Sequence, residues 1–360
     1  MTSRRTMLAG AVGIAFCSCG LLKAAHAQGQ PTPRQAVTVN GRRVKTIDVH
    51  AHCVFPDSAA QLGPEGGPPP ATTRGNDETT IDLAQRLRAM DSQKVDMEVL
   101  SVNPYWYGKP RELASQIVRI NNEKMAEFCA ANSERFAGFA SLTLQAPELA
   151  VRELETAMRR QGLKGAAIGG SVAGVDFSDP RFHPVWAKAE ELGATLFIHP
   201  AGVPQLSHRL AGNGWLANAI GNPLDTTIAL SHLIFEGTLD RFPGLRILAA
   251  HGGGYLGGYG ERSDHACFVN PPECNPAITL QKKPSEYLKQ IWFDSLVFTP
   301  EAIRHLAAQV GPGQIMLGSD YPFPWALEPV DHIFACDSLS DEQKLDVLGM
   351  TAAKVLNIPV

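Results

Sequence analysis

Eight short apolar runs divide the chain, and a stretch with helical patterning separates most runs from the next. The runs are Val44–His50, Met97–Val102, Phe136–Leu144, Leu163–Gly169, Ala194–His199, Leu245–His251, Ile291–Val297 and Gln314–Asp320. They are nearly continuous in Val, Ile, Leu and Phe rather than alternating, which is typical of parallel strands buried on both faces. Eight strands alternating with helices predict an α/β fold, a (β/α)8 TIM barrel. An open, doubly wound sheet is the structural alternative, but it explains the polar residues at the strand ends less well.

The stretches between the runs show the spacing of amphipathic helices. They are Ile81–Ser92, Arg111–Asn132, Ala146–Gln161, Pro184–Leu192, Thr226–Arg241 and Pro300–Gln309. Pro184 and Pro300 stand where the first helical turn tolerates proline, and Ser340 opens a last helix with capping-box spacing to Gln343. The 360 residues of the chain suit a single barrel.

The N-terminus predicts export. Arg4 and Arg5 precede an apolar run, Leu8–Leu22, and Ala25-His26-Ala27 follows it. A basic head, a short apolar core and small residues at a cleavage site are the layout of a bacterial export signal, and the paired arginines favour the twin-arginine route. The apolar run of about 15 residues is shorter than the roughly 20 that span a bilayer, so we expect no stable membrane insertion of the mature chain.

These features predict three segments and a periplasmic location. They are an export signal over residues 1–27, a polar linker over 28–43 and a catalytic barrel over 44–360. The net charge of −4, with no basic stripe, excludes a nucleic-acid-binding surface. Outside the signal the cysteines are odd in number and lack C-x-x-C spacing, which argues against a disulfide framework or a thiolate zinc site. Cys267 and Cys274 could still pair across a loop.

Histidines and a carboxylate stand at the C-terminal ends of the predicted strands. The first strand ends in an H-x-H pair, His50 and His52, which places two imidazoles side by side because alternate strand residues share a face. His199 ends the fifth strand and Asp320 the eighth. A lone histidine in such a place is more often a core residue, but strand ends in a barrel share one mouth, where active sites lie. We therefore predict that His50, His52, His199 and Asp320 hold one divalent cation.

The predicted ligands indicate which metals could bind and why a base should lie nearby. Imidazole and carboxylate ligands without thiolate suit zinc, and also manganese or iron. A bound divalent ion can lower the pKa of water toward about 7, so that a neighbouring base is useful for moving the proton. His251, at the end of the sixth strand, is the candidate for that base.

Several separated motifs resemble those of one family. They are IDVHAH (47–52), RLRAMD (86–91), QAPELA (145–150), GNP (221–223), AHGGG (250–254) and LGSDYPFP (317–324). From about Lys45 to Ile358 the chain resembles the amidohydrolase-related (amidohydrolase 2) family, in the branch typified by aminocarboxymuconate-semialdehyde decarboxylase. The resemblance implies a TIM barrel, metal ligands at His50, His52, His199 and Asp320, and a water-activating histidine at His251.

The resemblance also implies substrate-binding residues. Two arginines bind the substrate carboxylates in the semialdehyde decarboxylase, and the nearest positions here are Arg74 and Arg262. The second arginine comes from the neighbouring subunit in that enzyme, so the resemblance suggests a homodimer. Trp215 matches an aromatic residue of the substrate pocket, and Phe323, just past the metal-binding aspartate, could line the pocket too. As alternatives, Arg74 is a solvated loop arginine and Trp215 packs beneath a loop.

Two reaction classes remain after comparison with other amidohydrolases. The fourth strand ends without the lysine that bridges two metals, since Lys164 lies near its start, and no Glu follows His199 at the spacing of a deaminase. We expect a metal-dependent, non-oxidative decarboxylase of an aromatic or unsaturated carboxylic acid, with catalytic His251 and Asp320. The alternative is a metal-dependent hydrolase of an ester, lactone or amide. A non-catalytic metal-binding scaffold is a distant third, because it requires a purely structural His251.

Overall fold

The structure, a computed structural model, describes residues 34–63 and 73–360. The predicted export signal lies outside the described residues. The described part of the predicted linker contains an antiparallel hairpin, in which β1 (Val37–Val39) pairs with β2 (Arg42–Val44). Asn40 and Gly41 form its turn, both with positive φ (48° and 78°), as a two-residue hairpin requires. The linker prediction therefore overlooked an Asn-Gly hairpin signal that the sequence carries.

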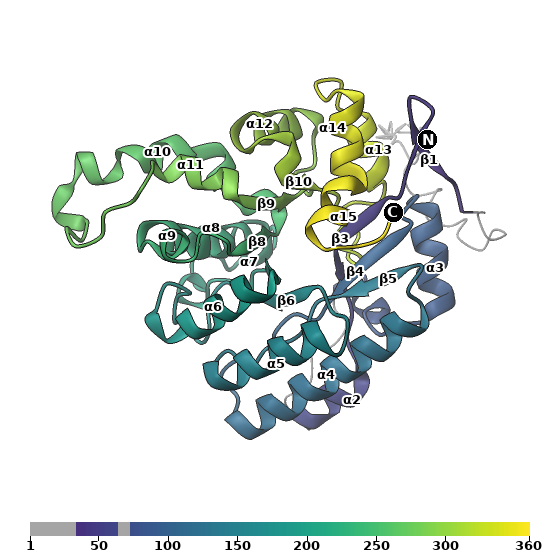
Figure 1. The fold of residues 1–360 in the computed structure, drawn as a ribbon, viewed down its shortest axis with the longest axis horizontal. Helices are drawn as coiled ribbons and strands as arrows, with labels where there is room; N and C mark the ends of the chain where they lie inside the picture. Colours follow the sequence, from purple (N-terminus) through teal and green to yellow (C-terminus); the bar gives the residue numbers. More distant parts are fainter. Residues whose placement is uncertain (1–33, 64–72) are drawn as a thin grey trace, which may run out of the picture. The chain divides into compact units, whose positions relative to one another are not determined.

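In the described part of the chain, eight parallel strands follow the hairpin and form a (β/α)8 barrel, as predicted (Figure 1). Their bounds are β3 Ile47–His52, β4 Met97–Ser101, β5 Phe136–Gly138, β6 Gly165–Ile168, β7 Thr195–Ile198, β8 Arg246–Ala249, β9 Ile291–Asp294 and β10 Ile315–Met316. Strands β3–β5 pair in one group and β6–β10 in another. Backbone hydrogen bonds join the groups on both sides, from Ala167 N–H to Ala140 O (2.9 Å) and from Asp320 N–H to His50 O (2.8 Å).

Helices surround the strands at the predicted places. The longer ones are α3 Leu83–Ser92, α4 Arg111–Ala131, α5 Pro147–Arg159, α6 His183–Leu192, α8 Gly221–Phe235, α10 Leu256–Val269 and α12 Pro300–Val310. The predicted helix Thr226–Arg241 divides at Gly237 (φ 71°) into α8 and α9 (Thr238–Arg241). Ser340 caps α14 (Asp341–Leu345) through a capping box with Gln343, as predicted. The sequence analysis missed α10, because its start is rich in glycine.

Short helical segments complete the fold. They are α2 Pro56–Ala59, α7 Leu216–Ala219, α11 Pro284–Tyr287, α13 Pro329–Phe334 and α15 Thr351–Val355. Among the described helices, none combines the length and the apolar character needed to cross a bilayer. Cys267 and Cys274, at the end of α10 and just beyond it, form the disulfide that the sequence analysis had left open, although the chain has no wider disulfide framework among its described cysteines.

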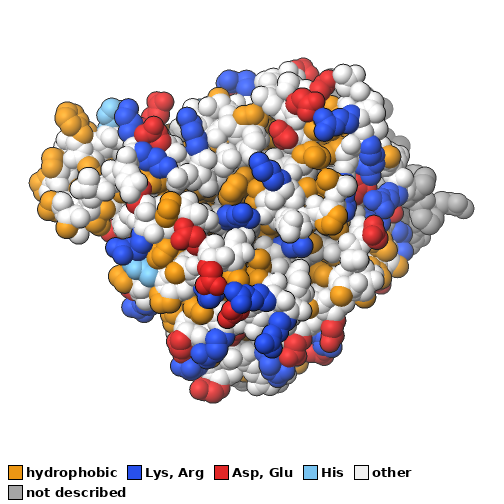
Figure 2. Space-filling model, viewed as in Figure 1, with side chains coloured by type: hydrophobic (Ala, Val, Ile, Leu, Met, Phe, Trp, Pro, Cys, Tyr) orange, Lys and Arg blue, Asp and Glu red, His pale blue; other side chains and the backbone are white. Residues whose placement is uncertain are grey.

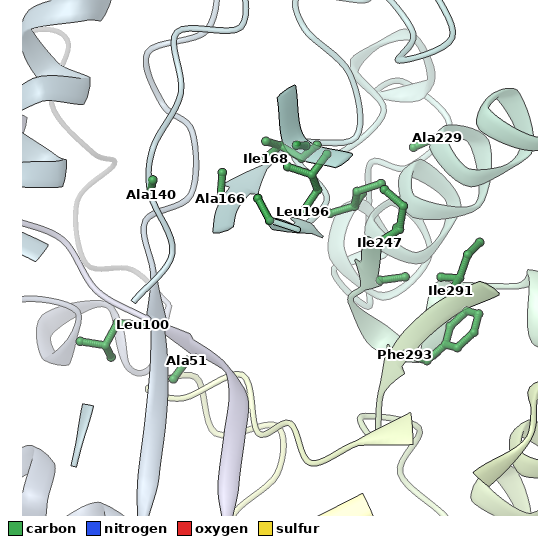
Figure 3. Close-up of a cluster of buried hydrophobic side chains, with 14 of the residues drawn as sticks. Ala51, Leu100, Ala140, Ala166, Ile168, Leu196, Ala229, Ile247, Ile291 and Phe293 are labelled. Atoms are coloured by element: carbon green, nitrogen blue, oxygen red, sulfur yellow. The ribbon is translucent and has the colours of Figure 1, made fainter. Parts of the chain in front are cut away.

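Strand side chains fill two apolar layers. Phe197 and Leu248 belong to the layer inside the barrel. Leu196 and Ile247 belong to the outer layer, which packs against the helices (Figure 3). Burying a large apolar side chain of this kind stabilises the fold by roughly 1.5–3 kcal/mol. Residues 352–358, at the C-terminus, join the interior layer and pack against the N-terminal ends of the strands. The opposite, C-terminal ends of the strands are therefore the barrel mouth.

A β-bulge in β3 directs its histidines to the mouth. The register with β4 shifts between Asp48 and Ala51, so that Val49 belongs to the interior layer and Ala51 to the outer one. The His50 ring lies beside the inward Phe197, with ring centroids 5.1 Å apart, and 4.9 Å from the His52 ring. Bulges commonly redirect side chains next to active sites.

Candidate metal centre

Four side chains converge at the barrel mouth from three parts of the chain. His50 and His52 come from β3, His199 follows β7, and Asp320 follows β10. One ligand atom of each lies within 4.8 Å of the others. Asp320 Oδ1 is 3.1 Å from His50 Nε2 and 2.7 Å from His52 Nε2. The structure thus brings together the four residues that the sequence analysis proposed as ligands.

All four groups are buried, and their charges are poorly balanced. Their exposed fractions are between 0% and 6%. Burial lowers the pKa of His50, but Asp320 and Asp294 outweigh it and raise that pKa to about 10. Burial lowers the pKa of His199, which the neighbouring imidazoles reinforce. Burial would raise the pKa of Asp320, but His50 and the other imidazoles hold it well below the usual range. Asp320 and Asp294 therefore favour the binding of a positive charge, a proton or a cation, between them.

Asp294, at the end of β9, is a site residue that the sequence analysis missed. Its Oδ2 lies 2.6 Å from His50 Nδ1 and accepts the backbone N–H of His251 at 2.9 Å, while Oδ1 accepts the N–H of Gly252 at 2.9 Å. A carboxylate on the far nitrogen of a metal-binding histidine fixes its tautomer and ring orientation. Asp294 ends β9, but the predicted strand ran on to Val297, so its position at a strand end was not visible in the sequence analysis.

A second buried carboxylate joins the first strand to the last. Asp48 accepts the backbone N–H of His50 at 2.9 Å and a hydrogen bond from the Ser319 hydroxyl. Burial and the nearby Glu98 raise the pKa of Asp48 to about 7, against the hydrogen bonds that lower it. These contacts hold the backbones that carry His50 and Asp320 against each other.

The residues present fit a divalent cation. Asp294 and Asp320 are buried, and no Lys or Arg of residues 34–63 and 73–360 makes an ion pair with either. His199 Nδ1 is buried without a hydrogen-bond partner among the described atoms. Imidazoles and a carboxylate without thiolate are a donor set for zinc, manganese or iron. A divalent metal site is therefore supported, and a bridging lysine is absent from it, because Lys164 Nζ bonds Asn357 O at the opposite end of the barrel.

His251 lies next to the four convergent groups and opens onto a hollow. Its Nε2 is 3.7 Å from Asp320 Oδ2, and its side chain is 14% exposed, more than any of the four. His251 and Asp320 both adopt positive φ (56° and 64°), which costs about 1–3 kcal/mol for residues other than glycine and is concentrated at functional sites. His251 is therefore placed beside the metal site, with access to a ligand.

Three of the four residues proposed to bind substrate line one hollow at the mouth. Arg74, Trp215 and Phe323 border a cavity of about 490 Å³, and the Phe323 ring lies 5.8 Å from the His52 ring. Arg262 does not join them. It is exposed on α10, where it borders a separate hollow with Phe235 and His265.

Comparison with known proteins gives one family. The sequence model described as "Amidohydrolase" matches residues 47–358. The chain is 32% identical over 289 residues to 2-amino-3-carboxymuconate-6-semialdehyde decarboxylase of Dictyostelium discoideum, covering 78% of each chain. It superposes on 5-carboxyvanillate decarboxylase of Sphingomonas paucimobilis with a TM-score of 0.81 and 27% identity, covering 88% of this chain and 100% of the other.

A second solved structure shares the fold. It is a 5-carboxyvanillate decarboxylase of Novosphingobium aromaticivorans, complexed with manganese and 4-hydroxy-3-methoxy-5-nitrobenzoic acid. The TM-score is 0.80, the identity is 21%, and the match covers 91% of this chain and 100% of that one. The site geometry, the family match and the relatives agree on a metal-dependent enzyme.

Proposed function

The chain belongs to the amidohydrolase family and is an enzyme, a metal-dependent carboxy-lyase, and from this premise we propose that it removes CO2 from an aromatic or unsaturated carboxylic acid. The observation that carries the proposal is the position of His251 beside four buried metal-binding groups, open to a hollow. Arg74 borders a second hollow, which shares Trp325 with the first. In this reaction the carbon–carboxylate bond breaks, CO2 leaves, and one proton replaces it on carbon. No oxidant is needed.

Each residue has a part in that reaction. His50, His52, His199 and Asp320 hold the cation, which supplies a Lewis acid for a carboxylate or hydroxyl oxygen and lowers the pKa of water. His251 moves the proton to and from the reacting centre, since its ring faces the cavity and its backbone is held by Asp294. Arg74 binds the substrate carboxylate with its planar guanidinium, which matches carboxylate geometry. Trp215 and Phe323 pack on the apolar part of the substrate.

Zinc is the ion that we propose, with manganese and iron as alternatives. Two or three imidazoles and one carboxylate are a common zinc donor set. Manganese also accepts imidazole and carboxylate, so the ion is a question for metal analysis of the purified protein.

Assembly and location complete the proposal. We propose a homodimer in which Arg262 reaches the site of the partner copy, because the α10 segment that carries it extends from the barrel (Figure 1). Hydrophobic side chains gather at the outer end of that segment (Figure 2), where Phe268 is 84% and Val269 is 75% exposed. The export signal proposed for residues 1–27 would place the enzyme in the periplasm.

A substrate panel tests the reaction class. Metal-loaded protein is incubated with aromatic and unsaturated carboxylic acids while CO2 release is followed, and in parallel with esters, lactones and amides. We expect CO2 from at least one acid, strongly reduced in His251→Asn and unchanged in His305→Asn, which alters an exposed histidine of α12. Turnover of a lactone, ester or amide without any CO2 release would establish the hydrolase alternative instead.

A further inference from the structure

Trp325 separates two hollows at the barrel mouth. The outer hollow, about 490 Å³, is bordered by Arg74, Trp215, Phe323 and Trp325. The inner hollow, about 150 Å³, is bordered by His251, Asn218, Asn222, Phe298 and Trp325, among others. Of the residues that the structure describes, Trp325 alone borders both hollows. A turn hydrogen bond from its N–H to Phe323 O (2.8 Å) ties it to the segment that follows Asp320.

Two aromatic residues that contact Trp325 have a strained backbone. Trp215 stacks on Trp325 with ring centroids 5.8 Å apart and 12° between the planes, and Phe298 meets Trp325 edge-on at 6.1 Å. Trp215 and Phe298 both have positive φ (49° and 61°), although large side chains rarely adopt it. Their side chains are nevertheless 49% and 59% exposed, so burial does not repay the strain. Exposed aromatic rings held in a strained backbone are better explained by ligand binding than by packing.

The size of the inner hollow limits what can reach His251. An apolar cavity of about 150 Å³ accepts one benzene ring. Trp325 borders this hollow on the side of the outer one, so a second fused ring that extends in that direction would meet the indole. Asn218 and Asn222 offer hydrogen-bonding groups to polar substituents on the ring that is admitted.

We propose that Trp325 is a specificity-determining residue that restricts the site beside His251 to acids with a single aromatic ring. The Trp215–Trp325 stack forms the wall against which that ring packs. Substituents that extend past the wall reach the larger hollow with Arg74. The proposal rests on the proposed function, because it assumes that the substrate is an aromatic acid, but its binding test is independent of CO2 release.

The test compares one-ring and two-ring acids. Binding of 2,6-dihydroxybenzoate and of 1-hydroxy-2-naphthoate to the metal-loaded protein is measured by calorimetry for the wild type, Trp325→Ala and Trp325→Phe. Loss of the stacking wall should weaken binding of the one-ring acid about three- to tenfold, in line with roughly 0.5–1.5 kcal/mol for an aromatic pair. The same change should strengthen binding of the two-ring acid, and Trp325→Phe should lie between. Leu327→Ala, at an exposed position two residues along, should change neither.

Three outcomes would overturn the proposal. The first is an equal change in the affinities for the one-ring and the two-ring acid. The second, if Trp325→Ala does not fold, is a ratio of the two affinities in Trp325→Phe that equals the wild-type ratio. The third is a change of oligomeric state with no change in that ratio. If the ratio shifts as expected while no acid releases CO2, the size limit stands and the proposed reaction fails.

Discussion

The two ends of the barrel both bury a carboxylate but balance its charge differently. At the N-terminal end, Asp96 receives hydrogen bonds from Arg34 (2.9 Å) and Arg43 (2.7 Å). At the C-terminal mouth, the described side chains that contact Asp320 are imidazoles. Arginine is charged at any ordinary pH, whereas an imidazole is a cation only when it binds a proton, which the raised pKa of His50 shows that the neighbouring carboxylates favour. The first carboxylate is therefore balanced by the chain itself, and the second is balanced only when a proton or a cation is added.

Backbone strain follows the same division. The mouth carries His251, Asp320, Trp215 and Phe298 in left-handed backbone, although none of them is glycine. At the N-terminal end the hairpin places Asn40 and Gly41 in its turn, where this backbone is favourable. Lys94 and Asn357 also have positive φ there, each just past the end of a helix, where this backbone is common. Left-handed backbone at aromatic residues and at residues of the candidate site is thus found at the mouth. In TIM barrels the two faces commonly divide in this way.

Replacing Asp320 should give the largest loss of function. Asp320→Asn removes a negatively charged ligand from a buried cluster. Replacing a residue that only hydrogen-bonds to a metal ligand costs up to about 100-fold, so we expect metal affinity and kcat/KM to fall by at least that much. Metal analysis and CO2 release on the same preparation measure this. If this variant retained metal and turnover, Asp320 would not be a carboxylate that needs a cation, and the contrast with Asp96 would be wrong.

Asp294→Asn should have a smaller effect on the same site. The change weakens the contact with His50 Nδ1 without touching the metal directly, and metal affinity should fall about 10- to 100-fold. Competition with a chelator measures the affinity. Asp240→Asn is the matched control, because Asp240 accepts a hydrogen bond from Tyr287 far from the mouth and should leave metal affinity unchanged.

Arg74→Ala should raise KM by about tenfold or more with little change in kcat, since a hydrogen bond to a charged group contributes about 1.5–3 kcal/mol. Steady-state kinetics with the acid identified by the panel measure both constants. The exposed Arg88 of α3 offers the control, Arg88→Ala, for which neither constant should change. If kcat falls while KM stays constant, Arg74 does not act by binding the carboxylate in the ground state.

Asp96→Asn should have the smallest effect on turnover and act on stability instead. Burial would raise the pKa of Asp96, but hydrogen bonds from Arg43, Thr46 and Arg34 outweigh it and lower that pKa. A depressed pKa in the folded state stabilises the fold above the unfolded value near 3.9, and this stabilisation is lost as the pH falls through the folded pKa. The wild type should therefore have the higher Tm at pH 7, and the difference from Asp96→Asn should shrink below about pH 4. A difference that is independent of pH would show that the carboxylate charge is not responsible.

The sequence predicts the barrel and four convergent groups because both follow from short-range patterns. Apolar runs mark buried strands, and parallel strands bring His50, His52, His199 and Asp320 to one end whatever the loops do. The sequence analysis missed Asp294 because the role of this residue depends on a contact with His50, 244 residues away along the chain. The stack of Trp215 on Trp325 likewise depends on how two loops approach each other, which no local pattern specifies.

The N-terminal hairpin was missed, and the disulfide was left open, for a different reason. Asn40-Gly41 directly after the β-branched residues 37–39 is a local hairpin signal, but the polar composition around it outweighed it. The sequence analysis correctly named Cys267 and Cys274 as a possible pair, although the odd number of cysteines outside the signal argued against a disulfide framework. The disulfide lies beyond the barrel, at the end of α10, where strand periodicity carries no information.

Metal stoichiometry tests the central claim most directly. The purified wild type, Asp96→Asn and His52→Ala are each saturated with zinc or manganese, freed of excess ion and analysed for metal per chain. The structure predicts about one divalent ion per chain in the wild type and in Asp96→Asn, and near-zero retention in His52→Ala, whose Nε2 lies 2.7 Å from Asp320 Oδ1. Equal retention in all three proteins, or none in the wild type, would contradict the assignment of a metal site to the barrel mouth.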